Sequence, residues 1–158
     1  MAHPRIVMIG NPIMDISIED QDRTYLDKYK LELGQASLAT EEQLPIYDEL
    51  YNLEGRQIIP GGSALNSARA AQHMLGKLGS DAKVAYFGCI GADEKGEALE
   101  KAVAEAGMQG HFAKDSETKT GTCAVVVVGK ERTLCANLAA CCKYPLEHLE
   151  SHMVSWSE

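Results

Sequence analysis

Apolar and polar positions follow two different periods along the chain, and each period predicts a different kind of element. Short apolar runs that end at glycine occupy residues 5–10 and 83–88, which is typical of buried strands. Each run is followed by apolar residues at helical spacing, over 63–75 with small side chains and again between Asp93 and Gly107. This alternation of strand and helix predicts a parallel α/β sheet.

A second set of strands differs from this pattern. Residues 14–19 alternate between apolar and polar, which predicts a half-exposed strand. Residues 120–128 and 132–138 are strand-like runs joined by the turn 129–131, which predicts a β-hairpin. We therefore expect a small antiparallel sheet appended to the parallel one. The junction of two such layers is a usual place for a small-molecule pocket.

The stretch 20–55 is acidic and predicts two short helices, at 22–30 and 40–53. Thr40 and Gln43 have the spacing of a capping box. Pro45 predicts that the regular part of the second helix begins there. The acidic side chains of this stretch are expected to form a solvated face: Asp20, Asp22, Asp27, Glu41 and Glu42.

Composition limits the classes of function. The chain has 158 residues, of which 45% are hydrophobic, enough for a domain with a sizeable core. A net charge of −8 disfavours nucleic acid and anionic lipid as partners. No apolar segment resembles a membrane span or a signal peptide, so we expect no membrane partner and a cytoplasmic protein, with the nucleus as the alternative location. The five cysteines lack CxxC spacing, which favours free thiols.

Two groups of residues at the ends of expected elements are candidates for ligand binding. Asn11 and Asp15 follow the first strand, and an amide beside a carboxylate suits vicinal hydroxyls such as those of a ribose. Their alternative role is to stabilise a strand-end turn. Gly61 and Gly62 precede a helix that carries Asn66 one turn in, an arrangement in which backbone N–H groups can approach a ligand. The alternative is a tight connection capped by Ser63.

Other chemistry-bearing residues favour structural roles. The segment 88–96 is expected to turn at its glycines and to cap a helix with Asp93. Cys123 is expected to line a pocket rather than act as a nucleophile. Adjacent cysteines make poor joint zinc ligands, so Cys141 and Cys142 with His148 and His152 predict no metal site, and these histidines are expected at the surface of a terminal helix.

Five motifs occur in order: GNPIMD at 10–15, PGGSALNSARAAQ at 60–72, GCIGADEKGE at 88–97, TGTCAVVV at 120–127 and ERTLCANLAA at 131–140. Together they resemble the N-terminal half of the ribokinase-like (PfkB) carbohydrate and nucleoside kinases. The first and fourth motifs resemble the adenosine kinases of that family.

The resemblance implies a fold and a division of the chain. The family has a three-layer α/β/α domain with a small β-sheet lid, which would be incomplete in this chain. Residues 1–12, 61–109 and 139–158 would belong to the large domain. Residues 13–60 and 110–138 would form the lid and its flanking segments.

The resemblance also implies transfer of the ATP γ-phosphate to the adenosine 5′-hydroxyl, giving AMP for purine salvage, with ATP and Mg²⁺ as cofactors and a monomeric enzyme. Asp15 would accept hydrogen bonds from the ribose hydroxyls. Asn11, Gly62 and Asn66 would hold the sugar, and Gly61 and Ser63 would shape the loop. The pocket would be lined by Ile13, Leu38, Cys123, Leu134 and Ala136. Arg132 would approach the transferring phosphoryl group, where charge develops.

The chain departs from the family pattern in two respects. The family's catalytic Asp lies in a glycine-rich DTxGAGD-like motif near the C-terminus, and neither this motif nor the ATP-site segments occur in residues 1–158. Cys142 stands where the family commonly has Asn. We therefore expect a partial chain that has no catalytic base and is inactive alone. The alternatives are a ribokinase-like kinase of another nucleoside or sugar, and a non-catalytic nucleoside-binding protein.

Overall fold

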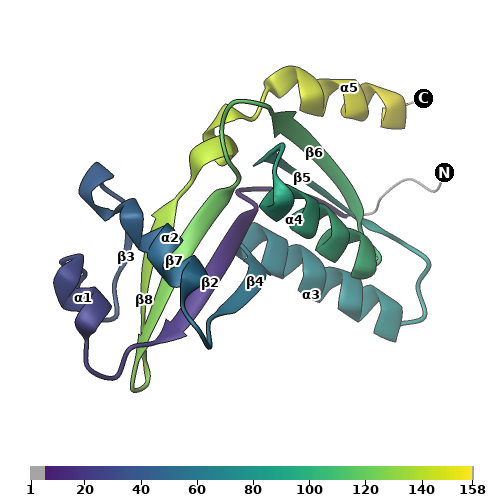
Figure 1. Ribbon diagram of the computed structural model, residues 1–158. Helices are drawn as coiled ribbons and strands as arrows, with labels where there is room; N and C mark the ends of the chain where they lie inside the picture. The colour runs from purple at the N-terminus through teal and green to yellow at the C-terminus, as the bar shows by residue number, and fades with distance from the viewer. Residues whose placement is uncertain (1–5, 158) are drawn as a thin grey trace.

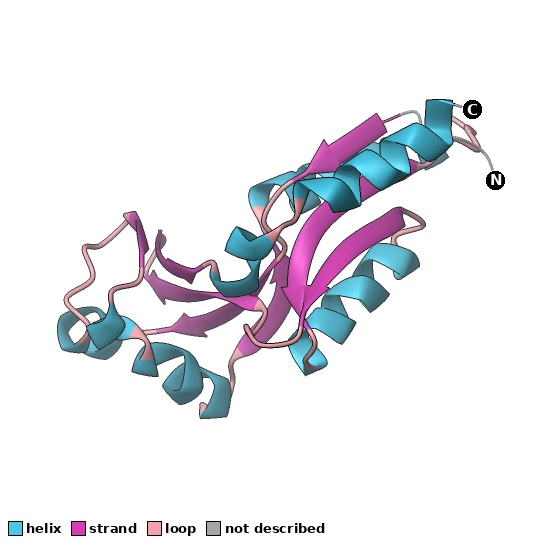
Figure 2. Cartoon of the chain, turned by 90° about the horizontal axis from the view of Figure 1, so that it is seen from above, coloured by secondary structure: helices cyan, strands magenta, loops and turns pink. Residues whose placement is uncertain are grey.

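The computed structural model describes residues 6–157, and the side chains of residues 6–153. Its strands form two sheets that meet end to end (Figures 1 and 2). The first sheet has the order β1 (Ile6–Ile9), β5 (Val84–Gly91), β6 (Gln109–Asp115). The second has the order β3 (Ala36–Leu38), β8 (Glu131–Asn137), β7 (Gly121–Val128), β2 (Ile13–Glu19), β4 (Gln57–Gly61).

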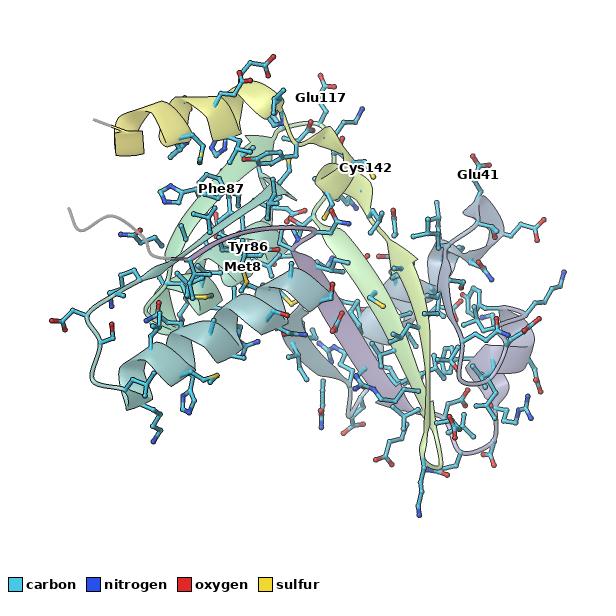
Figure 3. All side chains as sticks on the ribbon, turned by 180° about the vertical axis from the view of Figure 1, so that it is seen from behind. Met8, Glu41, Tyr86, Phe87, Glu117 and Cys142 are labelled. Carbon is cyan, nitrogen blue, oxygen red and sulfur yellow. The ribbon has the colours of Figure 1, made fainter. Side chains whose placement is uncertain are left out.

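The three-stranded sheet confirms the parallel α/β prediction. β1 pairs with β5 and β5 with β6, both in parallel. The helices α3 (Ser63–Lys77) and α4 (Glu94–Glu105) lie on one face, and α5 (Leu146–Ser157) lies on the other (Figure 1). Successive side chains of β5 therefore point to opposite layers. Tyr86 points toward α3 and Phe87 toward α5 (Figure 3).

The second sheet is mixed, so the prediction of an antiparallel sheet was wrong. The hairpin β7–β8 and the pair β2–β4 are antiparallel, but β2 runs parallel to β7 and β3 runs parallel to β8. The physical reason is the point of entry. Both β2 and β7 begin where the chain leaves the three-stranded sheet, so both run outward in the same direction (Figure 1).

The alternation predicted for β2 separates the two faces of this sheet. Met14, Ile16 and Ile18 are buried, whereas the residues between them are half-buried. Ile16 and Ile18 pack into a core with α1 (Thr24–Lys28) and α2 (Pro45–Asn52). The helices thus cover one face of the sheet, and the face that carries Asp15 is left for other contacts.

Three strands were not predicted: β3, β4 and β6. Residues 109–115 lack a clear apolar alternation, and pairing with the buried strand β5 makes them a strand. This pairing places them in the sheet of β1, although residues 110–138 were expected with the lid. The remaining boundaries between the lid and the large domain stay a prediction.

Two short 3₁₀ helices, η1 (Glu41–Gln43) and η2 (Ala139–Lys143), complete the elements. The capping box is confirmed, because the Gln43 side-chain oxygen accepts a hydrogen bond of 3.0 Å from the Thr40 N–H. Pro45 is the first residue of α2, as predicted. The five cysteines are free thiols. None of the described helices is long and apolar enough to cross a bilayer.

Asp20 is not part of the solvated acidic face, in contrast to the prediction. It is only 6% exposed, and its carboxylate accepts hydrogen bonds from the Thr24 N–H at 2.9 Å and the Tyr25 N–H at 2.8 Å. The carboxylate can be buried because N–H groups at the start of α1, which have no partner within the helix, donate hydrogen bonds to it. The other residues of that face are exposed, as predicted: Asp22, Asp27, Glu41 and Glu42.

We predict that Asp20→Ala lowers the free energy of unfolding by about 1–2 kcal/mol, because α1 loses its capping acceptor. Urea denaturation followed by circular dichroism measures this. The matched control is Asp22→Ala, two residues on and exposed, which we expect to change little. Equal effects of the two substitutions would contradict the capping role.

His148 and His152 are not surface side chains of the terminal helix, so that expectation was wrong. Both are partly buried, and their rings lie 4.7 Å apart between centroids. Both rings make edge-to-face contacts with the Phe87 ring of the sheet. The centroid of the His152 ring lies 5.5 Å from that of Phe87 and 4.6 Å from that of His111. The stacked rings of Phe87 and His111, 4.8 Å apart, give α5 a flat aromatic surface to cover.

This cluster predicts a loss of stability in mild acid. Burial first, and then the neighbouring histidine charges, lower the pKa of His111 and of His148. Protonation therefore favours the unfolded chain, in which the histidine pKa is about 6.5. We expect full stability above that pH and a decrease as the pH falls below it. Unfolding between pH 7.5 and 5.5 tests this. His111→Gln should flatten the decrease, and the exposed His73→Gln should not.

Candidate functional site

The segments that connect the two sheets bring Asn11 and Asp15 next to Gly61 and Gly62. Gly62 has φ = 102°, and a Cβ on it would collide with the backbone oxygen of Asn11. Gly61 lies opposite Ile13 in the β2–β4 pair, and a Cβ there would collide with the Asp15 carboxylate. Both positions therefore require glycine, because the backbone and a carboxylate occupy the space that a side chain would need.

Gly62, rather than Ser63, is the N-cap residue of α3, so the alternative of a connection capped by Ser63 is not what the structure shows. The positive φ of Gly62 starts the helix one residue earlier than a serine cap would, and Ser63 becomes the first helical residue. Ser63 is exposed. Its backbone oxygen accepts a 3.0 Å hydrogen bond from the Ser67 hydroxyl.

The strand register aligns several of the predicted residues in one row across the second sheet. Asp15 is the partner of Cys123, Cys123 is the partner of Ala136, and Ala136 is the partner of Leu38. Directly paired residues point to the same face of a sheet. Residues separated by more than a hundred positions in the sequence therefore share one face, opposite to that covered by α1 and α2.

Three further predicted residues share this face because strand positions alternate. Ile13 lies two residues before Asp15, and Leu134 lies two residues before Ala136. Arg132 follows in the same series, opposite Val127. The face thus combines the Asp15 carboxylate, the Arg132 guanidinium and several apolar side chains, with the Glu19 carboxylate at its exposed end.

Asp15 is the partly buried charge of this face. Burial raises the pKa of Asp15, and the positive charge of Arg132 partly offsets this effect. The Cys123 thiol beside it has a pKa of about 12, because of burial and then the Asp15 charge. Cys123 is therefore neutral at physiological pH, which suits a pocket wall and not a nucleophile.

Asn66 lies apart from this row. It is exposed on the first turn of α3 and lines a groove of about 650 Å³ together with Arg69, His73 and Glu105. No hydrogen bond among the described residues joins its side chain to Asp15. The sugar-holding role of Asn66 stays a prediction.

Ile59 is a residue of this face that the sequence pattern did not identify. It lies opposite Asp15 on β4 and is 44% exposed, so the row extends to the edge of the sheet. The sequence feature that could have indicated this strand is the apolar pair Ile58 and Ile59, which lies shortly before the two glycines. An isolated pair of this kind does not define a strand without its partner.

The residues considered for zinc lie in separate environments. The Cys141 thiol donates to the Pro12 backbone oxygen at 3.3 Å, whereas Cys142 is exposed. His148 and His152 pack against the aromatic surface of the sheet. Among the described residues, no group of His, Cys, Asp or Glu side chains is arranged to hold a metal ion.

The fold and the site define a two-sheet α/β protein. Gly61 and Gly62 lie where the two sheets meet, beside the face that carries Asp15 and Arg132. The family profile described as "pfkB family carbohydrate kinase" matches residues 33–158. The chain belongs to this family. The resemblance inferred from the five motifs is thereby confirmed.

Several relatives of the chain are adenosine kinases. It is 43% identical to adenosine kinase 1 of Arabidopsis thaliana over 90% of its length, and 37% identical to the adenosine kinase of Dictyostelium discoideum over 96%. The crystal structure of Anopheles gambiae adenosine kinase, in complex with a di(adenosine) tetraphosphate, matches 92% of the chain with 38% identity and a TM-score of 0.84. The Schistosoma mansoni enzyme in complex with adenosine matches 96% with 31% identity and a TM-score of 0.85.

The match covers only part of each relative. The chain spans 40% of the Arabidopsis protein and 43% of the Dictyostelium protein. It also spans 41% of the Anopheles chain and 43% of the Schistosoma chain. The likeness therefore concerns the part of these proteins that corresponds to the two sheets described above.

We predict that Asp15→Asn stabilises the protein at neutral pH. Because burial raises the folded-state pKa of Asp15, its ionised form opposes folding above that pKa, and a neutral amide removes the penalty. The gain should disappear in acid, where the wild-type carboxyl is protonated. Thermal unfolding at pH 7 and pH 3.5 measures it, with the exposed Glu19→Gln as control. A destabilised variant at pH 7 would contradict the prediction.

Proposed function

We propose that the protein containing this chain is an adenosine kinase, which transfers the γ-phosphate of ATP to the 5′-hydroxyl of adenosine to give AMP. The relatives that are 31–43% identical over most of the chain support this proposal. The observation that carries it is the cross-strand row of Asp15, Cys123, Ala136 and Leu38, which combines a hydroxyl-binding carboxylate with an apolar wall.

Asp15 binds the ribose in this proposal. An ionised carboxylate has two oxygens that accept hydrogen bonds, which matches the two vicinal hydroxyls of the sugar. The absence of a side chain on Gly61 leaves room for the carboxylate itself. Asn11, Gly62 and Asn66 hold the same sugar, while Ser63 shapes the loop with Gly61. The sugar then replaces the water that Asp15 loses through burial.

The base lies against the apolar part of the face. This wall consists of Ile13, Leu38, Cys123, Leu134 and Ala136. The Leu38 side chain is 65% exposed, and covering it with a flat aromatic base removes apolar surface from water. The small side chains of Cys123 and Ala136 leave space above the centre of the sheet.

Arg132 supplies positive charge on the phosphate side. Arg132 lies on the same face by strand alternation, and its positive charge lowers the pKa of both Asp15 and the Cys123 thiol. A guanidinium placed there stabilises the charge that spreads over the phosphoryl oxygens during transfer. It assists the reaction and does not replace a catalytic base.

The catalytic base and the ATP site lie outside this chain in the proposal. Mg²⁺ supplies charge neutralisation for the phosphates of bound ATP. The described residues do not form a metal-binding group, so we assign no ligand of Mg²⁺ to this chain. The chain supplies binding and orientation of the nucleoside.

The cellular setting follows from this activity. We propose a monomeric enzyme of purine salvage that acts in the cytoplasm on a small-molecule substrate. Phosphorylation of adenosine, inosine and ribose by the protein that contains this chain tests the specificity. Preference for adenosine supports the proposal. Preference for ribose or inosine favours a kinase of another sugar or nucleoside, and binding without turnover favours a non-catalytic protein.

We predict that Asp15→Ala in that protein costs about 3–5 kcal/mol of transition-state stabilisation. This corresponds to a decrease in kcat/KM for adenosine of between roughly a hundredfold and a few thousandfold. Two ribose hydroxyls lose a charged acceptor. Steady-state kinetics measures the loss. Glu19→Gln is the matched control, because Glu19 lies on the same face of β2 but at its exposed end. Near-normal kcat/KM in Asp15→Ala would remove this residue from the site.

A further inference from the structure

A short crossing leads from the first sheet into strand β7 of the second. The chain passes from β6 to β7 through residues 116–120, at the junction of the two sheets (Figure 1). Thr120 ends this crossing, is only 2% exposed, and stands three residues before Cys123 of the candidate site. Its position therefore determines where β7 begins.

Asp93 holds this crossing to α4. One carboxylate oxygen accepts hydrogen bonds from the Thr120 hydroxyl at 2.6 Å and from the Gly96 N–H at 2.9 Å. The other accepts the Thr120 N–H at 2.8 Å. Burial acts to raise the pKa of Asp93, but the hydrogen bonds from Thr120 and Gly96 lower it overall. Asp93 is thus ionised at neutral pH, and its bonds to Thr120 are charge-assisted.

Close backbone packing leaves the crossing little freedom. A Cβ on Gly91 would lie 2.5 Å from the Thr120 nitrogen and 2.6 Å from the Thr118 oxygen. The Gly91 N–H also donates to the Thr120 hydroxyl oxygen at 3.0 Å. These contacts join the end of β5 to the residues directly before β7.

The same crossing contacts the segment that follows β8. The Lys119 backbone oxygen accepts a 3.0 Å hydrogen bond from the Ala140 N–H. A Cβ on Gly121 would lie 2.9 Å from the Leu138 oxygen. The segments before β7 and after β8 are therefore held to each other. Asp93 contacts only the segment before β7.

We propose that Asp93 is a positioning residue of the nucleoside site: by holding Thr120, it sets β7, and β2 paired with it, relative to the first sheet. Asp15 and Cys123 are partners in that pair, so a shift of β7 moves both walls of the site. The inference rests on the proposed function where it concerns substrate affinity. The expected role of Asp93 as a helix cap is confirmed and is extended by this contact.

Positioning and stability have different kinetic signatures. A structural loss that removes folded enzyme irreversibly lowers apparent kcat and leaves KM unchanged, and Val103→Ala reports how far reversible unfolding alone raises KM. A loss of positioning reduces the fraction with a binding-competent site, which raises KM and leaves kcat at saturation unchanged. The two roles can therefore be separated in one experiment.

The test uses the full protein that contains this chain and the variants Thr120→Val, Thr120→Ser and Val103→Ala. Thr120→Val removes the hydroxyl and keeps the size of the side chain, while Thr120→Ser restores the hydroxyl. Val103→Ala weakens the buried face of α4 without touching the crossing. We expect Thr120→Val to raise KM for adenosine about tenfold, the effect of one charge-assisted hydrogen bond, with kcat within about twofold. Thr120→Ser should be near wild type.

Hydrogen exchange of the backbone amides gives a readout that does not require activity. We expect Thr120→Val to speed exchange in residues 121–124 by about tenfold beyond any change in the rest of the protein, and Val103→Ala to give no such local excess. Unchanged KM and exchange in Thr120→Val, or equal effects of Val103→Ala, would overturn the inference. A wild-type protein that does not phosphorylate adenosine refutes the proposed function. Exchange then decides alone whether Asp93 holds β7 in place.

Discussion

The parallel pairing of β2 with β7 is the constraint on which the rest of the structure depends. It places Asp15 opposite Cys123 and divides the second sheet into a face covered by α1 and α2 and a face free for a ligand. A shift of the register by one residue would move every side chain of β2 to the other face. The pairing also requires both strands to leave the first sheet together, which explains why the junction is so closely packed.

Three aspartates show how this architecture distributes charge. Asp20 and Asp93 are satisfied by backbone N–H groups, and each fixes the start of a segment. Asp15 has no such bond among the described residues, and burial raises its pKa. A carboxylate that is costly to ionise and has no hydrogen-bond partner is typical of a binding site, where a ligand supplies the missing partners. The contrast separates acids with a structural role from the candidate site acid better than exposure does.

The sequence predicted more of the site than of the sheet that carries it. Asn11, Asp15, Gly61 and Gly62 stand in short motifs whose local geometry is readable, and the structure places them together. The direction of β2 relative to β7 was predicted wrongly, because period-two alternation shows which residues share a face and not which way a neighbour runs. Strand β6 was missed for a related reason, since its pairing with β5 creates the strand.

The sequence by itself determined the elements with a strong local pattern and the family to which the chain belongs. Helix α3, the buried strand β5, the β7–β8 hairpin and the caps at Thr40 and Asp93 depend on neighbouring residues, so periodicity and capping reveal them. Only the tertiary structure decided that Asp20 is buried, that His148 and His152 cover a sheet, and that Asp93 holds Thr120. These outcomes depend on contacts between residues that are distant in sequence or on how the helices pack, which local patterns do not encode.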